Sequence, residues 1–186
     1  MRVIAGTARG VSLKTPDGLA TRPTADRVKE AVFSILHFDL PGASVLDLFG
    51  GTGQLGIEAL SRGAVSCDFT DESEAACKII RENLKRAKFE AMGSVFRSDY
   101  AAYLRRCKKK YDIIFLDPPY ANDFLENSLK LISEIDILQT GGIIFTERPL
   151  EKDLLLEFAG YTRSKDYKYG KTLIAMYRKN TEQNDG

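Results

Sequence analysis

The chain has 186 residues, 44% of them hydrophobic and 28% charged, with a formal net charge of +1, which is the composition of one ordinary folded domain with room for a core. No stretch approaches the roughly 18 apolar residues of a membrane-spanning helix, and the start MRVIAGTARG lacks the apolar region of a signal peptide, so a cytoplasmic protein is expected. The 3 cysteines have no CxxC spacing and there is 1 histidine, which argues against a disulfide framework and against a metal site.

Residues 1–42 are predicted to form a small unit of their own, a hairpin followed by a helix. Apolar runs at 3–5 and 11–13 flank a glycine-containing turn and indicate the hairpin. After Pro23, Thr24 can cap a helix over residues 25–37, whose apolar side chains recur on one face.

From residue 44 onward, short apolar runs alternate with segments of helical periodicity. The runs are residues 45–49, 65–70, 95–97, 113–116 and 143–146, and the helical segments are residues 55–61, 73–87, 100–107 and 123–134. This alternation is typical of an α/β fold with a doubly wound parallel sheet. Two last runs, 161–167 and 172–178, have so short a connection that they must form an antiparallel hairpin. Residues 43–180 are thus predicted to be one domain, and the polar end 181–186 a disordered tail.

The segment VLDLFGGTGQLGIEAL contains a glycine loop between the first strand and its helix. Gly50, Gly51 and Gly53 allow a ligand to lie on backbone N–H groups at the helix start. The loop is neither a P-loop nor a clean dinucleotide fingerprint, and the missing P-loop lysine argues against a triphosphate. Asp47, inside the strand, is a buried carboxylate that needs a partner, which a cationic or hydrogen-bond-donating ligand would supply.

Acidic residues follow the next two strands. Asp71 is placed to accept both hydroxyls of a ribose, with Glu72 as the neighbouring possibility, or it is a plain acid at a helix start. Asp99 is placed to accept from an adenine amino group, or it is a helix N-cap. Because the carboxyl ends of parallel strands meet at one edge of the sheet, these residues predict a site for an adenosine-containing ligand without a polyphosphate.

The fourth strand ends in FLDPPY, where two consecutive prolines stop the ladder because neither has an N–H to donate. Each proline also biases the residue before it toward extended geometry. The stiff segment therefore holds the Asp117 carboxylate and the Pro118 carbonyl as fixed acceptors beside Tyr120. A planar amine has two N–H donors that suit this pair, and Tyr120 can stack on its ring; the alternative is a sharp exit from the strand.

These motifs resemble those of a known family. A DPPY segment after the fourth strand, with D-x-F-x-G-x-G on the first, is similar to the S-adenosylmethionine-dependent amino-methyltransferases, whose targets include adenine N6, guanine N2 and glutamine amides. With RVIAGTARGVSLKTP and RPTADRVKEAVFSIL, nearly the whole chain resembles the RsmD family of bacterial 16S rRNA guanine-N2 methyltransferases. The resemblance implies a Rossmann-like class I methyltransferase fold with a mixed, mostly parallel seven-stranded sheet that ends in an antiparallel hairpin.

The resemblance also implies roles for individual residues. The S-adenosylmethionine site would comprise Asp47, Phe49, Gly50, Gly51, Gly53, Asp71, Asp99 and Asp117, and the catalytic segment Asp117, Pro118, Pro119 and Tyr120 would hold the guanine amine. The N-terminal unit would grip RNA or shape the mouth of the active site, with Arg2, Arg9, Arg22 and Arg27 on phosphates. Two positions depart from the family: Gly50 stands where alanine is expected, and Ser73 replaces a second acid after Asp71.

The expected function is methyl transfer from S-adenosylmethionine to the exocyclic N2 amine of a guanine in 16S rRNA. The enzyme is expected to be a monomer that acts on this RNA, on the small ribosomal subunit or on an assembly intermediate. Two alternatives stay open. One is the same chemistry on adenine N6 in DNA or RNA, and the other is a non-catalytic RNA-binding or assembly protein on a methyltransferase fold.

Overall fold

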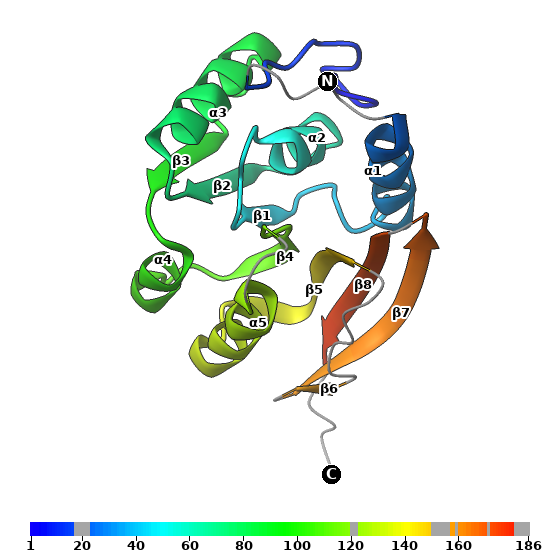
Figure 1. Ribbon diagram of the computed structural model, residues 1–186, viewed down its shortest axis with the longest axis vertical. Helices are drawn as coiled ribbons and strands as arrows, with labels where there is room; N and C mark the ends of the chain where they lie inside the picture. Colours follow the sequence, from blue (N-terminus) through cyan, green and yellow to red (C-terminus); the bar gives the residue numbers. More distant parts are fainter. Residues whose placement is uncertain (17–22, 120–122, 150–156, 159, 171, 181–186) are drawn as a thin grey trace.

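The computed structural model describes the chain except for residues 17–22, 120–122, 150–156, 159, 171 and 181–186. One eight-stranded sheet runs through it in the order β3-β2-β1-β4-β5-β8-β7-β6 (Figure 1). The strands are β1 (Ser44–Asp47), β2 (Ser66–Asp71), β3 (Gly93–Arg97), β4 (Tyr111–Leu116), β5 (Leu138–Pro149), β6 (Glu157–Phe158), β7 (Tyr161–Tyr169) and β8 (Thr172–Lys179). The pairs among β1 to β5 are parallel, and β8, β7 and β6 add antiparallel pairs.

Five helices are described on the two faces of this sheet. They are α1 (Pro23–Ile35), α2 (Gln54–Ser61), α3 (Glu74–Ala87), α4 (Tyr100–Arg106) and α5 (Phe124–Ile135). Figure 1 shows α1, α2 and α3 on one side of the sheet and α4 and α5 on the other. The predicted mixed α/β fold with its C-terminal antiparallel hairpin is confirmed; the sheet has one strand more than expected because the two-residue β6 pairs with the edge strand β7. Among the described residues, no helix is long and apolar enough to cross a membrane.

The alternation of side chains along the central strands divides the core into two clusters. Odd-numbered positions such as Val45, Ile113 and Phe115 pack with residues of α1, α2 and α3. Even-numbered positions such as Leu46 and Ile114 pack on the other face, with α4 and α5. Because successive strand residues point to opposite faces, the same parity fixes the side of the sheet on which the residues at the strand ends project.

The N-terminal unit shares the core cluster on the α1 side of the sheet. Val3 and Leu13 are buried in that cluster together with residues of α1. The predicted hairpin is reduced to one antiparallel bridge, Arg2 to Ser12, supported by bonds such as Val3 N–H to the Val11 carbonyl at 3.0 Å. The helix begins at Pro23, so Thr24 lies inside its first turn and not at the cap, since the fixed φ of proline suits the first helical position. The division at residue 42 stays a prediction.

A buried carboxylate ties this unit to α2. Glu58, which is fully buried, accepts the N–H groups of Ile4 at 2.8 Å and Ala5 at 3.0 Å. It also pairs with Arg62 at 2.9 Å and with the buried ammonium of Lys29 at 3.7 Å. A charge taken out of water persists only when its partners satisfy it. These four contacts therefore define how the first residues dock.

We expect Glu58→Ala to lower the free energy of unfolding by about 3 kcal/mol, because it leaves the buried Lys29 ammonium without its carboxylate. Urea unfolding measures this. The matched control is Glu82→Ala, which removes an exposed carboxylate that pairs with Lys14 and Arg86, and it should change the free energy of unfolding far less, because water screens exposed ion pairs. Equal losses in the two variants would show that the Glu58 contacts do not stabilise the docking of the N-terminus.

Candidate active site

A cavity of about 740 Å³ opens at the carboxyl edge of the sheet, where β1 to β4 end. It is lined by Leu48, Phe49, Gly51, Asp71, Glu72, Ser98, Asp99, Tyr100, Asp117, Pro118, Pro119 and Phe124. Its volume is in the range of small-molecule sites, and the carboxyl edge is where open α/β sheets bind ligands. The structure therefore brings most of the predicted cofactor and catalytic residues around one cavity.

The glycine loop forms the floor of this cavity for steric reasons. Gly53 has a φ of 77°, in the left-handed region that favours glycine, and directly precedes α2. At Gly50 a Cβ would lie 2.9 Å from the Ile80 Cδ1 and 3.3 Å from the Thr70 carbonyl oxygen. The close packing of α3 and β2 against the loop thus accounts for glycine at position 50, where the family resemblance led us to expect alanine.

Asp71 supports the loop from the end of β2. Its carboxylate accepts the Gly51 N–H at 2.9 Å and the Ser73 N–H at 2.8 Å, and it is half-buried at the cavity wall. The Ser73 hydroxyl accepts the Ala76 N–H at 3.3 Å as the N-cap of α3. Serine at this position therefore begins the helix, and Asp71 and the exposed Glu72 are the acids at the end of β2 that line the cavity.

An aromatic group forms another wall. The Phe49 ring centroid lies 5.5 Å from that of Tyr100 and 6.2 Å from that of Phe124, and Tyr100 and Phe124 meet edge to face at 5.7 Å. Asp99 beside them caps α4 by accepting the Ala102 N–H at 3.0 Å, as one of the two interpretations of this residue predicted. Such a wall suits a planar ring. Sequence reasoning missed Tyr100 and Phe124 as wall residues; the one signal was their position next to Asp99 and the DPPY segment.

Two carboxyl groups at the cavity have raised pKa values: Asp117, which lines it, and Asp47, which is buried at the end of β1. Asp47 is 2% exposed and accepts the Gly56 N–H at 3.1 Å. Burial raises its pKa to about 7, and the negative charge of Asp71 adds to the effect. Burial also raises the pKa of Asp117 well above its usual range, with contributions from Glu147 and then Asp47. Among the residues that the structure describes, no N–H or O–H group donates to the Asp117 side chain. None of the described ion pairs involves either group, so a positive charge in the cavity would favour the ionised form of both.

The predicted RNA-binding arginines lie elsewhere. Arg2 and Arg9 line a separate cavity of about 520 Å³, together with Arg62 just after the end of α2. Tyr120, Arg22 and the side chain of Arg27 fall outside the described residues. The two described arginines therefore line a different cavity from the one that the predicted cofactor residues line.

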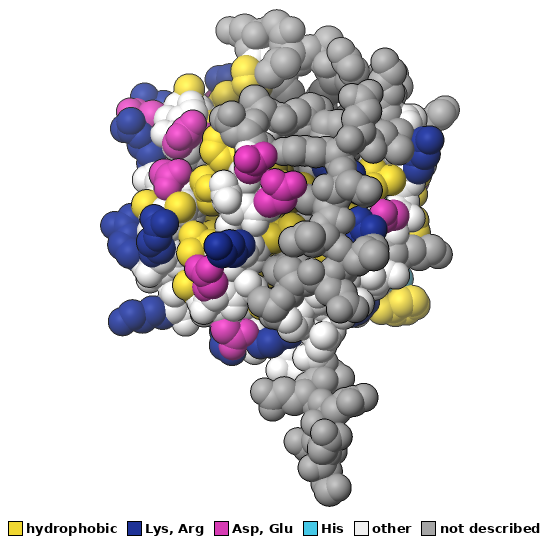
Figure 2. All heavy atoms as spheres, turned by 60° about the horizontal axis from the view of Figure 1, so that its bottom comes forward, with side chains coloured by type: hydrophobic (Ala, Val, Ile, Leu, Met, Phe, Trp, Pro, Cys, Tyr) yellow, Lys and Arg dark blue, Asp and Glu magenta, His cyan; other side chains and the backbone are white. Residues whose placement is uncertain are grey.

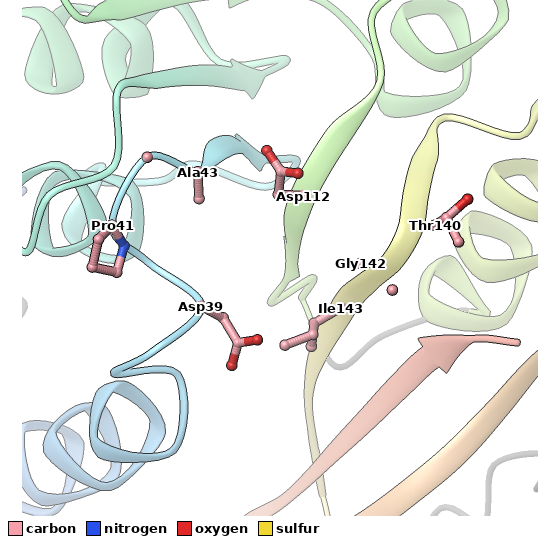
Figure 3. A pocket seen from close by; sticks show the side chains of 9 residues that line it. Asp39, Pro41, Ala43, Asp112, Thr140, Gly142 and Ile143 are labelled. Carbon is pink, nitrogen blue, oxygen red and sulfur yellow. The ribbon is translucent and has the colours of Figure 1, made fainter. Parts of the chain in front are cut away.

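A third, smaller cavity of about 220 Å³ lies at the opposite edge of the sheet (Figure 3). Two acids line it, Asp39 before β1 and Asp112 at the start of β4. The Asp112 carboxylate accepts the Ser44 N–H at 2.8 Å, and Asp39 pairs with Arg178 at 3.7 Å. The protein itself therefore supplies the partners of both acids in this cavity. Asp117, in contrast, has no such donor among the described residues.

An open sheet of this strand order, with a glycine loop and acidic strand ends around one cavity at its carboxyl edge, defines a class I methyltransferase fold. The structure titled "Putative methyltransferase yhhF from Escherichia coli" superposes with a TM-score of 0.88 at 27% identity, covering 98% of this chain and 99% of the other. The family model described as "Conserved hypothetical protein 95" matches residues 1–178.

Two curated relatives make the family assignment specific. "Putative rRNA methyltransferase YlbH" of Bacillus subtilis is 39% identical over 96% of this chain and 99% of its own. "Ribosomal RNA small subunit methyltransferase D" of Escherichia coli is 30% identical over 98% of this chain and 91% of its own. The chain therefore belongs to the RsmD family, as its motifs predict.

The raised pKa of Asp47 predicts that Asp47→Asn makes the ligand-free protein more stable than wild type at high pH. Between the ordinary value of 3.8 and about 7 the folded state binds a proton that the unfolded chain has lost, so wild-type stability falls through this window as pH rises. At pH 8 the variant should be more stable, by up to about 4 kcal/mol, and the gain should vanish near pH 4. Thermal or urea unfolding across this pH range measures it.

The matched control is Asp136→Asn, because Lys110 and Lys179 lower the pKa of this exposed acid. Its carboxylate stabilises the protein above the ordinary pKa, so this variant should be less stable than wild type at pH 8. The same sign of change in both variants would contradict the burial of an uncompensated charge at Asp47.

Proposed function

We propose that this protein transfers a methyl group from S-adenosylmethionine to the exocyclic N2 amine of a guanine in 16S ribosomal RNA. The observation that carries the proposal is the position of Asp117, Pro118 and Pro119 at one end of the cavity whose other walls are Phe49, Asp71 and Asp99. A ligand in the cavity would face an amine held at the proline segment. The names of the relatives, which specify ribosomal RNA and the small subunit, support the choice of substrate.

The cavity fits the methyl donor by chemistry. Adenine would pack against Phe49, Tyr100 and Phe124 with its amino group toward Asp99, and the ribose hydroxyls would bond Asp71 or Glu72. The bound donor supplies an electrophilic methyl group on a positively charged sulfur. Because Asp47 is buried and Asp117 half-buried, and no cation among the described residues pairs with either, positive charge is the property that the site would select.

The proline segment would act on the amine. The N2 lone pair of guanine is delocalised into the ring, so the nitrogen is a poor nucleophile. Acceptors at the Asp117 carboxylate and the Pro118 carbonyl would favour a pyramidal nitrogen and stabilise the positive charge that develops on it. As the nitrogen–carbon bond forms, the carbon–sulfur bond breaks and its electron pair goes to sulfur. N2 then loses a proton, for which Asp117 is the adjacent acceptor. Alignment of the amine with the methyl group supplies the other large contribution to the rate.

The first test supplies labelled S-adenosylmethionine to 16S rRNA that lacks the modification, both free and in assembled small subunits. We expect N2-methylguanosine on nucleoside analysis, and Asp117→Ala should lower the rate at least 100-fold with binding of the donor retained by calorimetry. The control Glu134→Ala removes an exposed acid at the far end of α5 and should keep the wild-type rate.

Methyladenosine as the product would favour the adenine alternative, and absence of donor binding would favour the non-catalytic alternative. Undiminished activity of Asp117→Ala would refute the role of the proline segment.

Residues 1–42 are proposed as the part that holds RNA. Arg2 and Arg9 are exposed beside the same cavity, and none of the described ion pairs involves them. A second basic group, on and after α4, differs from them: Lys109 pairs with Asp68 at 3.1 Å and Lys110 with Asp136 at 2.8 Å. Figure 2 shows Lys and Arg side chains gathered at the left of the face that it presents, the side where α4 lies in Figure 1. The arginines at the N-terminus are therefore the stronger candidates for phosphate contacts.

The double variant Arg2→Ala/Arg9→Ala is expected to weaken RNA binding and to reduce the slope of log K against log salt by about 1 to 2, since each phosphate contact contributes about 0.7 to 0.9. Filter binding at several salt concentrations measures both. The control Arg105→Ala/Arg106→Ala removes the same charge from the exposed end of α4. An equal loss of slope in this control would argue for non-specific electrostatics in place of a site at the N-terminus.

A further inference from the structure

The register of the central strands places three carboxyl groups on one face of the sheet. Asp47, Asp117 and Glu147 share the odd-numbered parity of Val45, Phe115 and Phe145, which pack on the α1 side. Phe115 pairs with Phe145 and Leu116 with Thr146 between the parallel strands β4 and β5, and the two Phe ring centroids are 5.7 Å apart.

Asp117 and Glu147 lie two residues beyond these phenylalanines. Because side chains two residues apart point to the same side of a strand, Glu147 projects next to Asp117.

The electrostatics agree with this placement. After burial, Glu147 makes the largest contribution to the raised pKa of Asp117, ahead of Asp47. Glu147 is half-buried and pairs with Ile174 of β8, within the sheet. The position of a side chain on a hydrogen-bonded strand is better defined than that of a side chain on a loop. Glu147 is therefore a well-positioned second carboxyl group beside the proposed amine acceptor.

Glu147 lies on the side of Asp117 that faces away from the cofactor cavity. That cavity extends over β1 to β4, and Glu147 is not part of its lining. Along the edge of the sheet the acids follow the strand order, with Asp99 after β3, Asp71 on β2, Asp117 after β4 and Glu147 on β5. With the methyl donor over β1 to β3, the target base would occupy the β4–β5 side, next to both Asp117 and Glu147.

We propose that Glu147 determines the base specificity of the reaction by accepting the N1–H of the target guanine, while Asp117 and the Pro118 carbonyl hold its N2 amine. This inference rests on the proposed function. The Watson–Crick edge of guanine presents N1–H and the N2 amine side by side as donors, and enzymes that act on extruded bases read this edge. A carboxylate has about four lone-pair directions, so Glu147 can accept from the base in addition to its interactions within the protein.

The same arrangement rejects adenine. Adenine has an acceptor lone pair at N1, which would face the Glu147 carboxylate and repel it. A site built around a hydrogen bond discriminates strongly against an analogue that lacks the group, because the bond is lost and two acceptors are brought together. Asp117 and the proline segment alone would accept an amine from either base. Glu147 thus supplies what the proline motif lacks, a contact that distinguishes guanine from adenine.

The test compares guanine with 2-aminopurine at the target position of a reconstituted small subunit. 2-Aminopurine keeps the N2 amine and has an acceptor at N1. For wild type we expect kcat/KM to be at least 100-fold lower with 2-aminopurine. In Glu147→Gln the guanine value should fall at least 10-fold and the ratio between the two bases should shrink below 10-fold, because the glutamine amide can donate to the N1 lone pair. The control Glu90→Gln, at an exposed acid, should keep the wild-type ratio.

Each enzyme is measured on both bases, so a loss of folded protein cancels in the ratio, and calorimetric binding of the methyl donor confirms the fold of each variant. Equal rates of wild type on the two bases, or an unchanged ratio in Glu147→Gln, would overturn the role of Glu147 while N2-methylguanosine still forms. Absence of N2-methylguanosine with wild type would instead overturn the proposed function.

Discussion

The site depends on carboxyl groups that the fold takes out of water without pairing them with a cation among the described residues. Asp47 and Asp117 end neighbouring parallel strands on the same face of the sheet, and burial raises the pKa of both. Elsewhere the protein gives its buried acids more partners: Glu58 has two backbone N–H groups and two cations, and Asp68 accepts from Tyr111 at 2.8 Å. The contrast indicates that the carboxyl groups at the carboxyl edge are kept for a ligand that would favour their ionised forms, at a cost in stability that ordinary packing would avoid.

The rest of the edge is arranged around these two acids. The glycine loop brings backbone close to them, Asp71 supports the loop through the Gly51 N–H, and a Cβ at Gly50 would force the Ile80 side chain to shift. Glu58 of α2 accepts the Ile4 and Ala5 N–H groups and so fixes the N-terminal segment that carries Arg2 and Arg9, which line a separate cavity. One short helix therefore joins the proposed donor site to the proposed RNA contact, and a change in its docking would affect both.

Sequence reasoning reached the mostly parallel sheet with its C-terminal hairpin, the helices and most of the cavity wall, because period-2 and period-3.6 patterns and strand-end residues are local signals. It could not find Tyr100 and Phe124 as partners of Phe49, since their meeting depends on the packing of α4 and α5. It also missed Glu147, which looks like an ordinary strand residue in IIFTERP; its proximity to Asp117 is set by the β4–β5 register. The extra strand β6 and the start of α1 at Pro23 were missed for a simpler reason, because element ends depend on tertiary context.

The electrostatics also suggest an order of events under the proposed function. With the cavity free of positive charge, Asp117 takes up a proton readily, because burial, Glu147 and Asp47 all raise its pKa. A protonated carboxyl group is a poor acceptor for an amine. A positively charged donor beside Asp47 and Asp117 favours their ionised forms and so lowers both pKa values. The methyl donor would thereby convert Asp117 into the acceptor that the base requires, and donor and base would bind with positive coupling through a shared proton equilibrium.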